Sequence, residues 1–341
     1  MRFIVFSDIH FYKNPSKSYI TDWGCSSWLI EQLRIVDQIF DFAKEYNIQY
    51  VIHNGDLFEE KNRIPQDLYN TVWMQFKNYS KDFKIILNTG NHDRILKREY
   101  SSLQPFSDIC TVVDKPTDYI IDDIFMRIIP YGMLDGNLGL PKEKYRSYLL
   151  FTHEDIAGLK HGSMDYTSNS PYKHQIFGDW TYMFNGHIHK PQELANIINI
   201  GSPMIQDWGE KDEQKRFIYY ENDHITSVPT DYPKFYEIDE LNDGVKERIE
   251  NDNRNFYRIS ISPEQLGDDI FKRFNVQPNV IRKKVREIRF KNEGGDELKQ
   301  YMKIAGVPEN LDGNYLLKIG RVISYLDKVN PIKEDLKIKE I

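Results

Sequence analysis

The sequence predicts a layered α/β sandwich in which two sheets pack face to face. Two observations predict it: strand-like and helix-like segments alternate over the first hundred residues, and strand-like segments dominate from about residue 108. Alternation of this kind is typical of right-handed β-α-β units and a largely parallel sheet. The strand-rich part would then supply a second sheet packed against the first.

Each expected element has its own sequence pattern. Strands expected in the first sheet are short, apolar and rich in β-branched or aromatic residues, at 2–7, 49–54 and 83–89. Two helices are expected at 28–46 and 67–80, where apolar residues recur at helical spacing. The later strand-like segments are 108–113, 118–122, 124–131, 147–152, 182–185 and 196–200.

The bulk composition excludes several classes of protein. A chain of 341 residues that is 40% hydrophobic and 28% charged indicates a globular protein of about two domains. It has no run of roughly 18 apolar residues and no signal-peptide pattern, so we expect a cytoplasmic protein without a membrane span. Cys25 and Cys110 lack the spacing of a disulfide framework or zinc site. The net charge of −7 argues against a generally phosphate-gripping surface but allows a local basic groove.

Polar residues follow five predicted strands, at the end where an open α/β sheet builds its sites. Any one of them, taken alone, is better explained as a turn, cap or surface residue. Together they offer carboxylate, amide and imidazole groups in the number that two metal ions sharing one carboxylate require. The seven candidate ligands are Asp8, His10, Asp56, Asn91, His153, His187 and His189, and His92 and Asp93 follow Asn91 in the same segment.

The donor types indicate the metal and the chemistry. Thiolates are absent, which disfavours structural zinc, and the imidazoles disfavour a purely magnesium site. We expect two divalent ions, Mn²⁺ ahead of Fe²⁺ or Mg²⁺. In an extended segment residues two apart face the same way, so His187 and His189 can reach neighbouring metals. Two metals about 3.5 to 4 Å apart clamp a phosphate and favour in-line displacement, so the predicted chemistry is phosphoester hydrolysis.

Five segments in a fixed order carry a resemblance to a known family. The segments SDIH, NGDLF, TGNHD, FTHE and NGHIH resemble the signatures of the calcineurin-like metallophosphoesterases. Within that superfamily, GHIHKPQ followed by NIGSPMIQDWGE is similar to the SbcD/Mre-eleven DNA-repair nucleases. The likeness covers residues 1 to about 230, and the compact length resembles that of phage members, the small subunits of recombination exonucleases.

The resemblance implies a fold and an activity. The fold is an α/β/β/α sandwich with a small α/β cap and C-terminal helices. The activity is metal-dependent exonuclease and endonuclease cleavage of double- and single-stranded DNA, in recombination, replication and repair. For a phage-encoded chain the location is the host cytoplasm. Two alternatives remain: a phosphodiesterase of small molecules, and a catalytically idle scaffold that recruits an ATPase.

The resemblance also implies a role for each strand-end residue. Asp56 is the carboxylate shared by both metals. His92 is the acid that assists the departing oxygen or steadies the transition state, and Asp93 orients it. The two ligand sets are Asp8, His10, Asp56 and His189 for one metal, and Asp56, Asn91, His153 and His187 for the other.

The composition shift near residue 245, read with the family resemblance, implies three domains: a nuclease domain at 1–240, a DNA-capping domain at 245–290 and a helical segment at 296–341 that binds an ATPase. The cap is expected as a strand, helix and strand at 255–262, 263–275 and 280–290. Its last strand carries a basic run that either binds DNA or forms a solvated strand face. The residues of this run are Arg282, Lys284 and Arg286 on one face and Lys283 and Arg289 on the other.

Two amphipathic helices are expected within 296–329, and they carry more apolar surface than two short helices hide by themselves. One interpretation is packing on the cap. The other, which the family likeness favours, is docking onto an SbcC/Rad-fifty-type ATPase. Two nuclease subunits and two ATPase subunits would then form a heterotetramer that contains a nuclease homodimer.

Overall fold

The computed structural model describes residues 1–281, except 23, 95–100, 136–137, 163–165 and 253. The chain forms two compact units, one of Met1–Ile259 with Asp268–Pro278 and one of Ser260–Gly267 with Asn279–Ile341. The basic residues Arg282, Lys283, Lys284 and Arg286 and the segment 296–329 lie outside the described residues. No helix in the described part of the chain is long and apolar enough to span a membrane.

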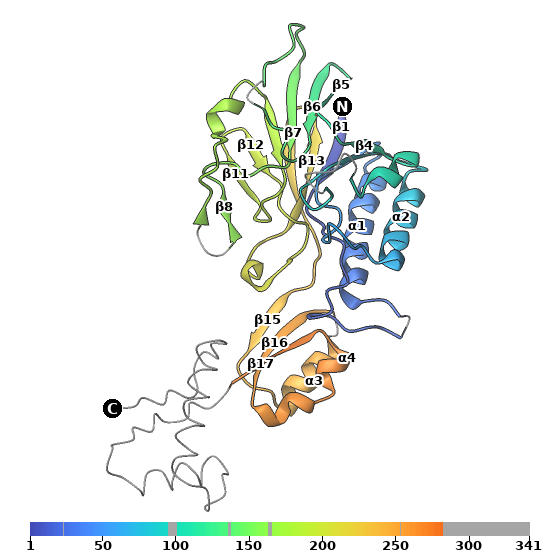
Figure 1. Cartoon of the computed structure of the whole chain (residues 1–341), viewed down its shortest axis with the longest axis vertical. Helices are drawn as coiled ribbons and strands as arrows, with labels where there is room; N and C mark the ends of the chain where they lie inside the picture. The colour runs from blue at the N-terminus through green and yellow to red at the C-terminus, as the bar shows by residue number, and fades with distance from the viewer. Residues whose placement is uncertain (23, 95–100, 136–137, 163–165, 253, 282–341) are drawn as a thin grey trace, which may run out of the picture. The chain divides into compact units, whose positions relative to one another are not determined.

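The first sheet is the predicted, largely parallel one (Figure 1). Strands β1 to β4 run parallel to one another, β13 pairs antiparallel with β1, and β14 pairs antiparallel with β13. The strand expected at 108–113 therefore joins this sheet as β4. In sheet order the six strands are β14 (His224–Pro229), β13 (Arg216–Glu221), β1 (Arg2–Phe6), β2 (Tyr50–Asn54), β3 (Lys84–Asn88) and β4 (Thr111–Val113).

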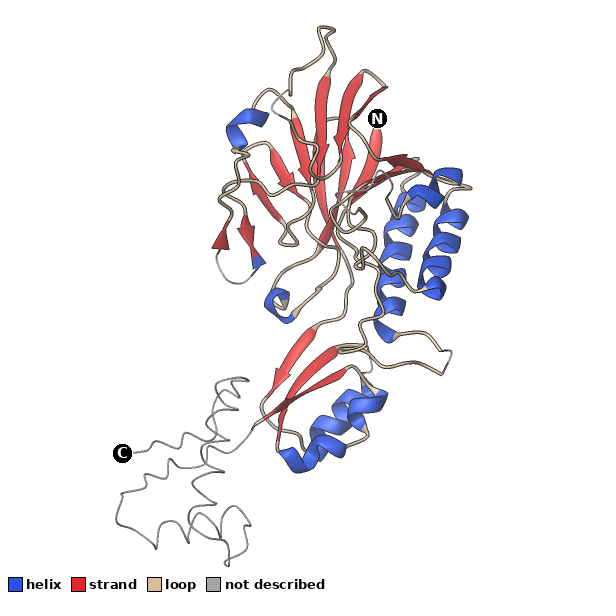
Figure 2. Cartoon of the chain, viewed as in Figure 1, coloured by secondary structure: helices blue, strands red, loops and turns tan. Residues whose placement is uncertain are grey.

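Two helices cover the outer face of this sheet, α1 (Ser27–Glu45) and α2 (Gln66–Tyr79) (Figure 2). Side chains alternate along a strand, so Ile4 and Phe6 of β1 pack in one core cluster with the helices. From α1, Ile35 and Ile39 enter this cluster at the four-residue spacing that places them on one helix face.

The second sheet packs against the other face of the first. Its central strands are parallel, and its two edge strands, β5 and β11, are antiparallel. Phe3 of β1 lies between the sheets, with its ring centroid 5.7 Å from that of Phe151 and 5.6 Å from that of Phe184. In sheet order the strands are β11 (Gln192–Leu194), β12 (Ile197–Asn199), β10 (Tyr182–Asn185), β7 (Ser147–Thr152), β6 (Ile124–Ile129) and β5 (Thr117–Ile121).

The outer face of the second sheet carries a third apolar cluster, which includes Leu150 and Met183. Among the described residues, loops and the 3-10 helix η3 (His174–Phe177) pack over it through Ile156, Phe177 and Trp180. A short hairpin, β8 (Lys160–His161) with β9 (Tyr166–Thr167), follows Ile156 in the chain. The layered α/β architecture expected from the sequence is confirmed.

A small three-stranded sheet follows the sandwich in the chain, in the order β15-β16-β17. The strand expected at 255–262 is present as β16, whereas the helix expected at 263–275 consists of two short pieces, η5 and α4. Trp28 of α1 packs against β16, with its ring 5.1 Å from that of Phe256. The elements are β15 (Phe235–Ile238), α3 (Asp243–Asn251), β16 (Phe256–Ile261), η5 (Pro263–Gly267), α4 (Ile270–Arg273) and β17 (Val276–Val280).

Candidate metal centre

The polar residues expected at strand ends come from both sheets and gather at one edge of the sandwich. Asp8 and His10 follow β1, Asp56 follows β2, and His153 follows β7. Among the described residues of this edge, potential metal donors form three groups, each with its donor atoms within 4.8 Å of one another, and two of these groups consist of expected ligands. One group is Asp8, His10 and His189, and the other is Asp56, His153 and His187.

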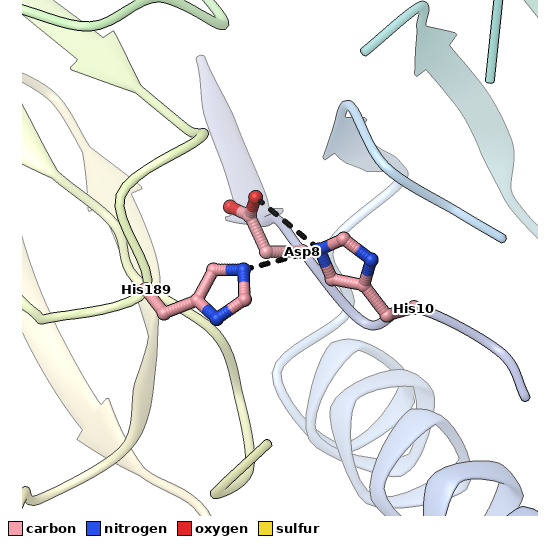
Figure 3. A group of neighbouring side chains, drawn as sticks. All are labelled: Asp8, His10 and His189. Carbon is pink, nitrogen blue, oxygen red and sulfur yellow. Dashed lines mark hydrogen bonds and ion pairs between the residues drawn. The ribbon is translucent and has the colours of Figure 1, made fainter. Parts of the chain in front are cut away.

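In the first group, two imidazoles meet beside a carboxylate (Figure 3). Nε2 of His10 lies 3.1 Å from Nε2 of His189 and 3.9 Å from Oδ1 of Asp8. Two ring nitrogens at this distance repel through their lone pairs unless a proton or a metal ion lies between them. The donor set of two nitrogens and one carboxylate suits a divalent transition metal.

In the second group, His153 is the best-defined donor. Its ring is fully buried, and Nδ1 lies 2.8 Å from the carbonyl oxygen of Asn54, which fixes the ring orientation. Nε2 has no hydrogen-bond partner in the described structure and lies 3.2 Å from Oδ2 of Asp56. An unpaired buried nitrogen beside a carboxylate fits a metal ligand. Nδ1 of His187 lies 2.8 Å from Oδ1 of Asn91, so the amide oxygen that was predicted as a metal ligand lies beside the second group.

Asp56 connects the two groups. Its Oδ2 lies 3.5 Å from Nε2 of His10 in the first group as well as beside His153 in the second. The residues therefore fit a pair of divalent ions that share one carboxylate.

The charges of this edge perturb its titratable groups. Burial alone would lower the pKa of His10, but the hydrogen bond to Glu59 and the charges of Asp56 and Asp8 raise it to about 9. Burial would also lower the pKa of His153, which the same two aspartates raise to about 10. Burial would raise the pKa of Asp56, yet the two imidazoles hold it well below its usual range. The carboxylates thus attract positive charge, which bound metal ions would supply in place of protons.

The backbone at these strand ends is unusual. Asp8, His10, Asp56 and His187 have φ values of 57°, 49°, 59° and 76°. Left-handed conformations are uncommon for residues other than glycine, and they concentrate at functional sites. Gly90 meets a related demand, because a Cβ atom there would overlap both the carboxylate and the backbone nitrogen of Asp56.

His92 lies beside the centre and remains about one quarter exposed, at 26%. Its backbone N–H donates to Oδ1 of Asp56 over 2.7 Å, and its ring Nδ1 lies 2.6 Å from the carbonyl oxygen of Glu59. Its ring centroid is 4.8 Å from that of His10. His10, Glu59 and His92 also form a third group of neighbouring donors.

The structure corrects the expected contact of Asp93. Its buried carboxylate accepts backbone N–H groups of Asp56, Leu57 and Gly90 over 2.8, 3.0 and 3.0 Å, whereas the ring Nδ1 of His92 lies 2.6 Å from the carbonyl oxygen of Glu59. Burial is the largest cause that raises the pKa of Asp93 to about 6, and the charge of Asp56 is the second. Asp93 therefore holds the loops that carry the centre, and it does not orient the His92 ring.

Two glutamates of the centre are absent from the sequence-based prediction. Glu59 places Oε2 2.7 Å from Nδ1 of His10, and Glu210 places Oε1 2.8 Å from Nδ1 of His189. Glu59 directly follows the segment NGDLF, and Glu210 is the last residue of the segment NIGSPMIQDWGE, but neither segment indicates which side chain its glutamate contacts. Burial would raise the pKa of Glu210, but the hydrogen bond to His189 and the charge of Lys215 lower it to about 2.

One known protein family and several solved structures are similar to this chain. The family described as Calcineurin-like phosphoesterase matches residues 1–191. Among solved structures, the nuclease MPE of Pseudomonas putida is similar with 15% identity and a TM-score of 0.30, covering 67% of this chain and 72% of its own. A dimetal phosphatase from Danio rerio is similar with 10% identity and a TM-score of 0.43, covering 67% of this chain and 96% of its own. No curated protein matches.

The family match spans 191 of the 341 residues, which is more than half of the chain. It covers both donor groups described above. The chain therefore belongs to the calcineurin-like phosphoesterases, metal-dependent hydrolases of phosphoester bonds.

Proposed function

We propose that this chain is a dimetal-dependent DNA nuclease that hydrolyses phosphodiester bonds. The observation that carries the proposal is the placement of Asp56 between two donor groups, with the partly exposed His92 beside them. Two divalent ions, with Mn²⁺ the first choice, would supply Lewis acidity toward the phosphate and the attacking water. Asp8, His10 and His189 would hold one ion, His153, His187 and Asn91 the other, and Asp56 both.

The protein's own residues have distinct tasks in this proposal. His92 is anchored at its backbone by Asp56 and at its ring Nδ1 by the carbonyl oxygen of Glu59. Since a carbonyl oxygen only accepts, Nδ1 carries a hydrogen and Nε2 is the atom that can exchange a proton with the leaving oxygen. Asp93 keeps Asp56 in place through the backbone N–H groups it accepts.

Three features favour DNA over a small phosphodiester. The centre is open to solvent at Glu59, which is 42% exposed, and at the donor His189, which is 30% exposed, so a large substrate can approach. The three-stranded module β15-β16-β17 follows the sandwich, where a small substrate would need no further module. The motifs resemble those of the SbcD/Mre-eleven nucleases, in which a cap presents DNA to the metals.

The proposal is tested by assaying the full chain on three substrates with Mn²⁺, with Mg²⁺ and with a chelator. We expect Mn²⁺-dependent digestion of end-labelled duplex and single-stranded DNA and none with the chelator. Hydrolysis of bis-p-nitrophenyl phosphate without any DNA digestion would instead identify a small-molecule phosphodiesterase. Binding of two metals without hydrolysis of any substrate would identify the chain as a catalytically idle scaffold.

The proposed role extends to recombination and repair within an SbcC/Rad-fifty-type ATPase complex. Support comes from the family likeness and from the apolar residues of 296–329, a segment outside the described residues, which recur at helical spacing. Two copies of each subunit would form the complex, and movement driven by ATP would control access of duplex DNA to the metals. These apolar residues include Leu316, Ile319, Val322, Ile323 and Leu326.

A chain truncated after Phe290 tests the docking segment. We expect it to retain two metals and hydrolysis of short single strands, because every residue of the two donor groups precedes the cut. It should no longer co-purify with the ATPase, and ATP should no longer stimulate duplex digestion. Titration of the truncated and full chains with the ATPase is the measurement, and equal affinities would contradict docking through 296–329.

A further inference from the structure

We propose that Glu210 is a positioning residue for His189 and sets the affinity of the metal site to which His189 contributes. The inference rests on the metal centre of the proposed function and is independent of the identity of the substrate. It starts from a contact that lies behind the centre: Oε1 of Glu210 is 2.8 Å from Nδ1 of His189.

The contact fixes which nitrogen of His189 faces the metal. An ionised carboxylate only accepts hydrogen bonds, so Nδ1 of His189 carries the hydrogen and the lone pair is on Nε2. Nε2 is the atom that lies 3.1 Å from Nε2 of His10 in the first donor group. A carboxylate behind a ligating imidazole fixes the tautomer and the ring plane and raises the basicity of the ligand.

Glu210 is itself held rigidly. It is 3% exposed, and its second oxygen, Oε2, accepts the backbone N–H of Gln206 over 3.0 Å and lies 2.7 Å from Nζ of Lys215. Its backbone belongs to the 3-10 helix η4 (Trp208–Glu210), which is capped by Asp207, whose side chain accepts from the backbone N–H of Gly209. Both carboxylate oxygens are therefore occupied, and the side chain cannot turn away from His189.

The contacts of Lys215 make it possible to distinguish a positioning role of Glu210 from a purely structural one. It is fully buried, donates to the carbonyl oxygen of His189 over 3.1 Å, and pairs with Glu213 over 2.8 Å as well as with Glu210. A buried lysine needs a carboxylate partner, which Glu213 already supplies. Of the two carboxylates paired with Lys215, Glu210 is the one that reaches His189.

The second donor group is built differently. Nδ1 of His153 lies against a neutral carbonyl oxygen, that of Asn54, where His189 has a carboxylate. Loss of Glu210 is therefore expected to affect one metal site and leave the other unchanged.

Two matched variants test the proposal in the full chain, Glu210→Gln and Glu213→Gln. Each removes one negative charge from beside Lys215, but only the first alters the partner of His189. Mn²⁺ is titrated into each metal-stripped protein by calorimetry, with the final stoichiometry checked by elemental analysis. In Glu210→Gln we expect one of two binding events to weaken about 10- to 100-fold and the other to stay unchanged. In Glu213→Gln both should match the unsubstituted chain.

Thermal unfolding of the metal-free variants controls for stability. A similar loss of stability in both, with weaker metal binding in Glu210→Gln alone, supports positioning. Unchanged affinities in Glu210→Gln, or equal weakening in the two variants, would assign Glu210 to folding only.

A second measurement uses the unsubstituted chain, so it tests the proposal even if Glu210→Gln does not fold. In the unsubstituted chain labelled with ¹⁵N-histidine and loaded with diamagnetic Zn²⁺, NMR should find the His189 proton on Nδ1 and the metal on Nε2. Zinc on Nδ1 would overturn the proposal. A chain that passes these tests but digests no DNA contradicts the nuclease proposal alone.

Discussion

Replacement of Asp56 by asparagine is expected to abolish phosphodiester hydrolysis and to weaken both metal sites at once. One oxygen of Asp56, Oδ2, lies 3.5 Å from Nε2 of His10 and 3.2 Å from Nε2 of His153, so one carboxylate serves both donor groups. Loss of a residue that only hydrogen-bonds a metal ligand lowers activity roughly 10- to 100-fold. We expect a much larger loss here, because Asp56 is itself a ligand of both metals. Elemental analysis of bound Mn²⁺ and hydrolysis of DNA are the measurements.

The fold should survive this substitution. Asparagine has the size of aspartate and retains an oxygen that can accept the backbone N–H of His92, now 2.7 Å from Oδ1. Asp67→Asn is the matched control, because the same chemical change is then made at an exposed residue at the start of α2. Two tightly bound metals and full activity in Asp56→Asn would rule out a shared carboxylate.

Replacement of His92 by alanine is expected to lower turnover by about a hundredfold or more while two metals stay bound. The reason is that His92 is absent from the two donor groups that contain Asp8 and Asp56, and its ring is held by the Glu59 carbonyl oxygen. DNA affinity should hardly change, so the effect should fall on kcat rather than on binding.

The leaving group provides a sharper readout for His92. p-Nitrophenolate leaves without needing a proton, whereas a deoxyribose oxygen needs one, so bis-p-nitrophenyl phosphate hydrolysis should fall less than DNA digestion. His224→Ala, at an exposed histidine of β14, is the matched control and should match the unsubstituted chain. Loss of a metal from His92→Ala would make His92 a ligand, through the third donor group with His10 and Glu59.

The sequence predicted those parts of the fold that depend on local pattern. Strands β1, β2 and β3 and helices α1 and α2 were recovered because apolar periodicity and turn residues mark them directly. The hairpin of β13 and β14 was missed. It pairs with β1 in a register that sets Ile4 opposite Tyr219, and no local pattern reports a partner so distant in the chain. The same limit explains why β4 was expected in the second sheet.

The candidate site followed the same rule. Donor residues at strand ends could be predicted because parallel strands bring their carboxyl ends to one edge whatever the details of packing. The partners of those donors could not, because Glu59 and Glu210 reach His10 and His189 only through the folded loops. Asp93 was misinterpreted for this reason, since its neighbour in sequence is not its hydrogen-bond partner.

The left-handed backbone of Asp8, His10, Asp56 and His187 has a consequence for how ions arrive. Each such conformation costs about 1 to 3 kcal/mol and persists only where neighbours impose it. Here the strand-end loops impose it on one another, through Asp8 N–H to Gly55 and His10 N–H to Asp56 at 3.0 and 3.1 Å. The ordering cost falls on folding, so an incoming ion loses little free energy to immobilising its ligands. We therefore expect the centre to release and rebind its ions without refolding of the loops that carry the ligands.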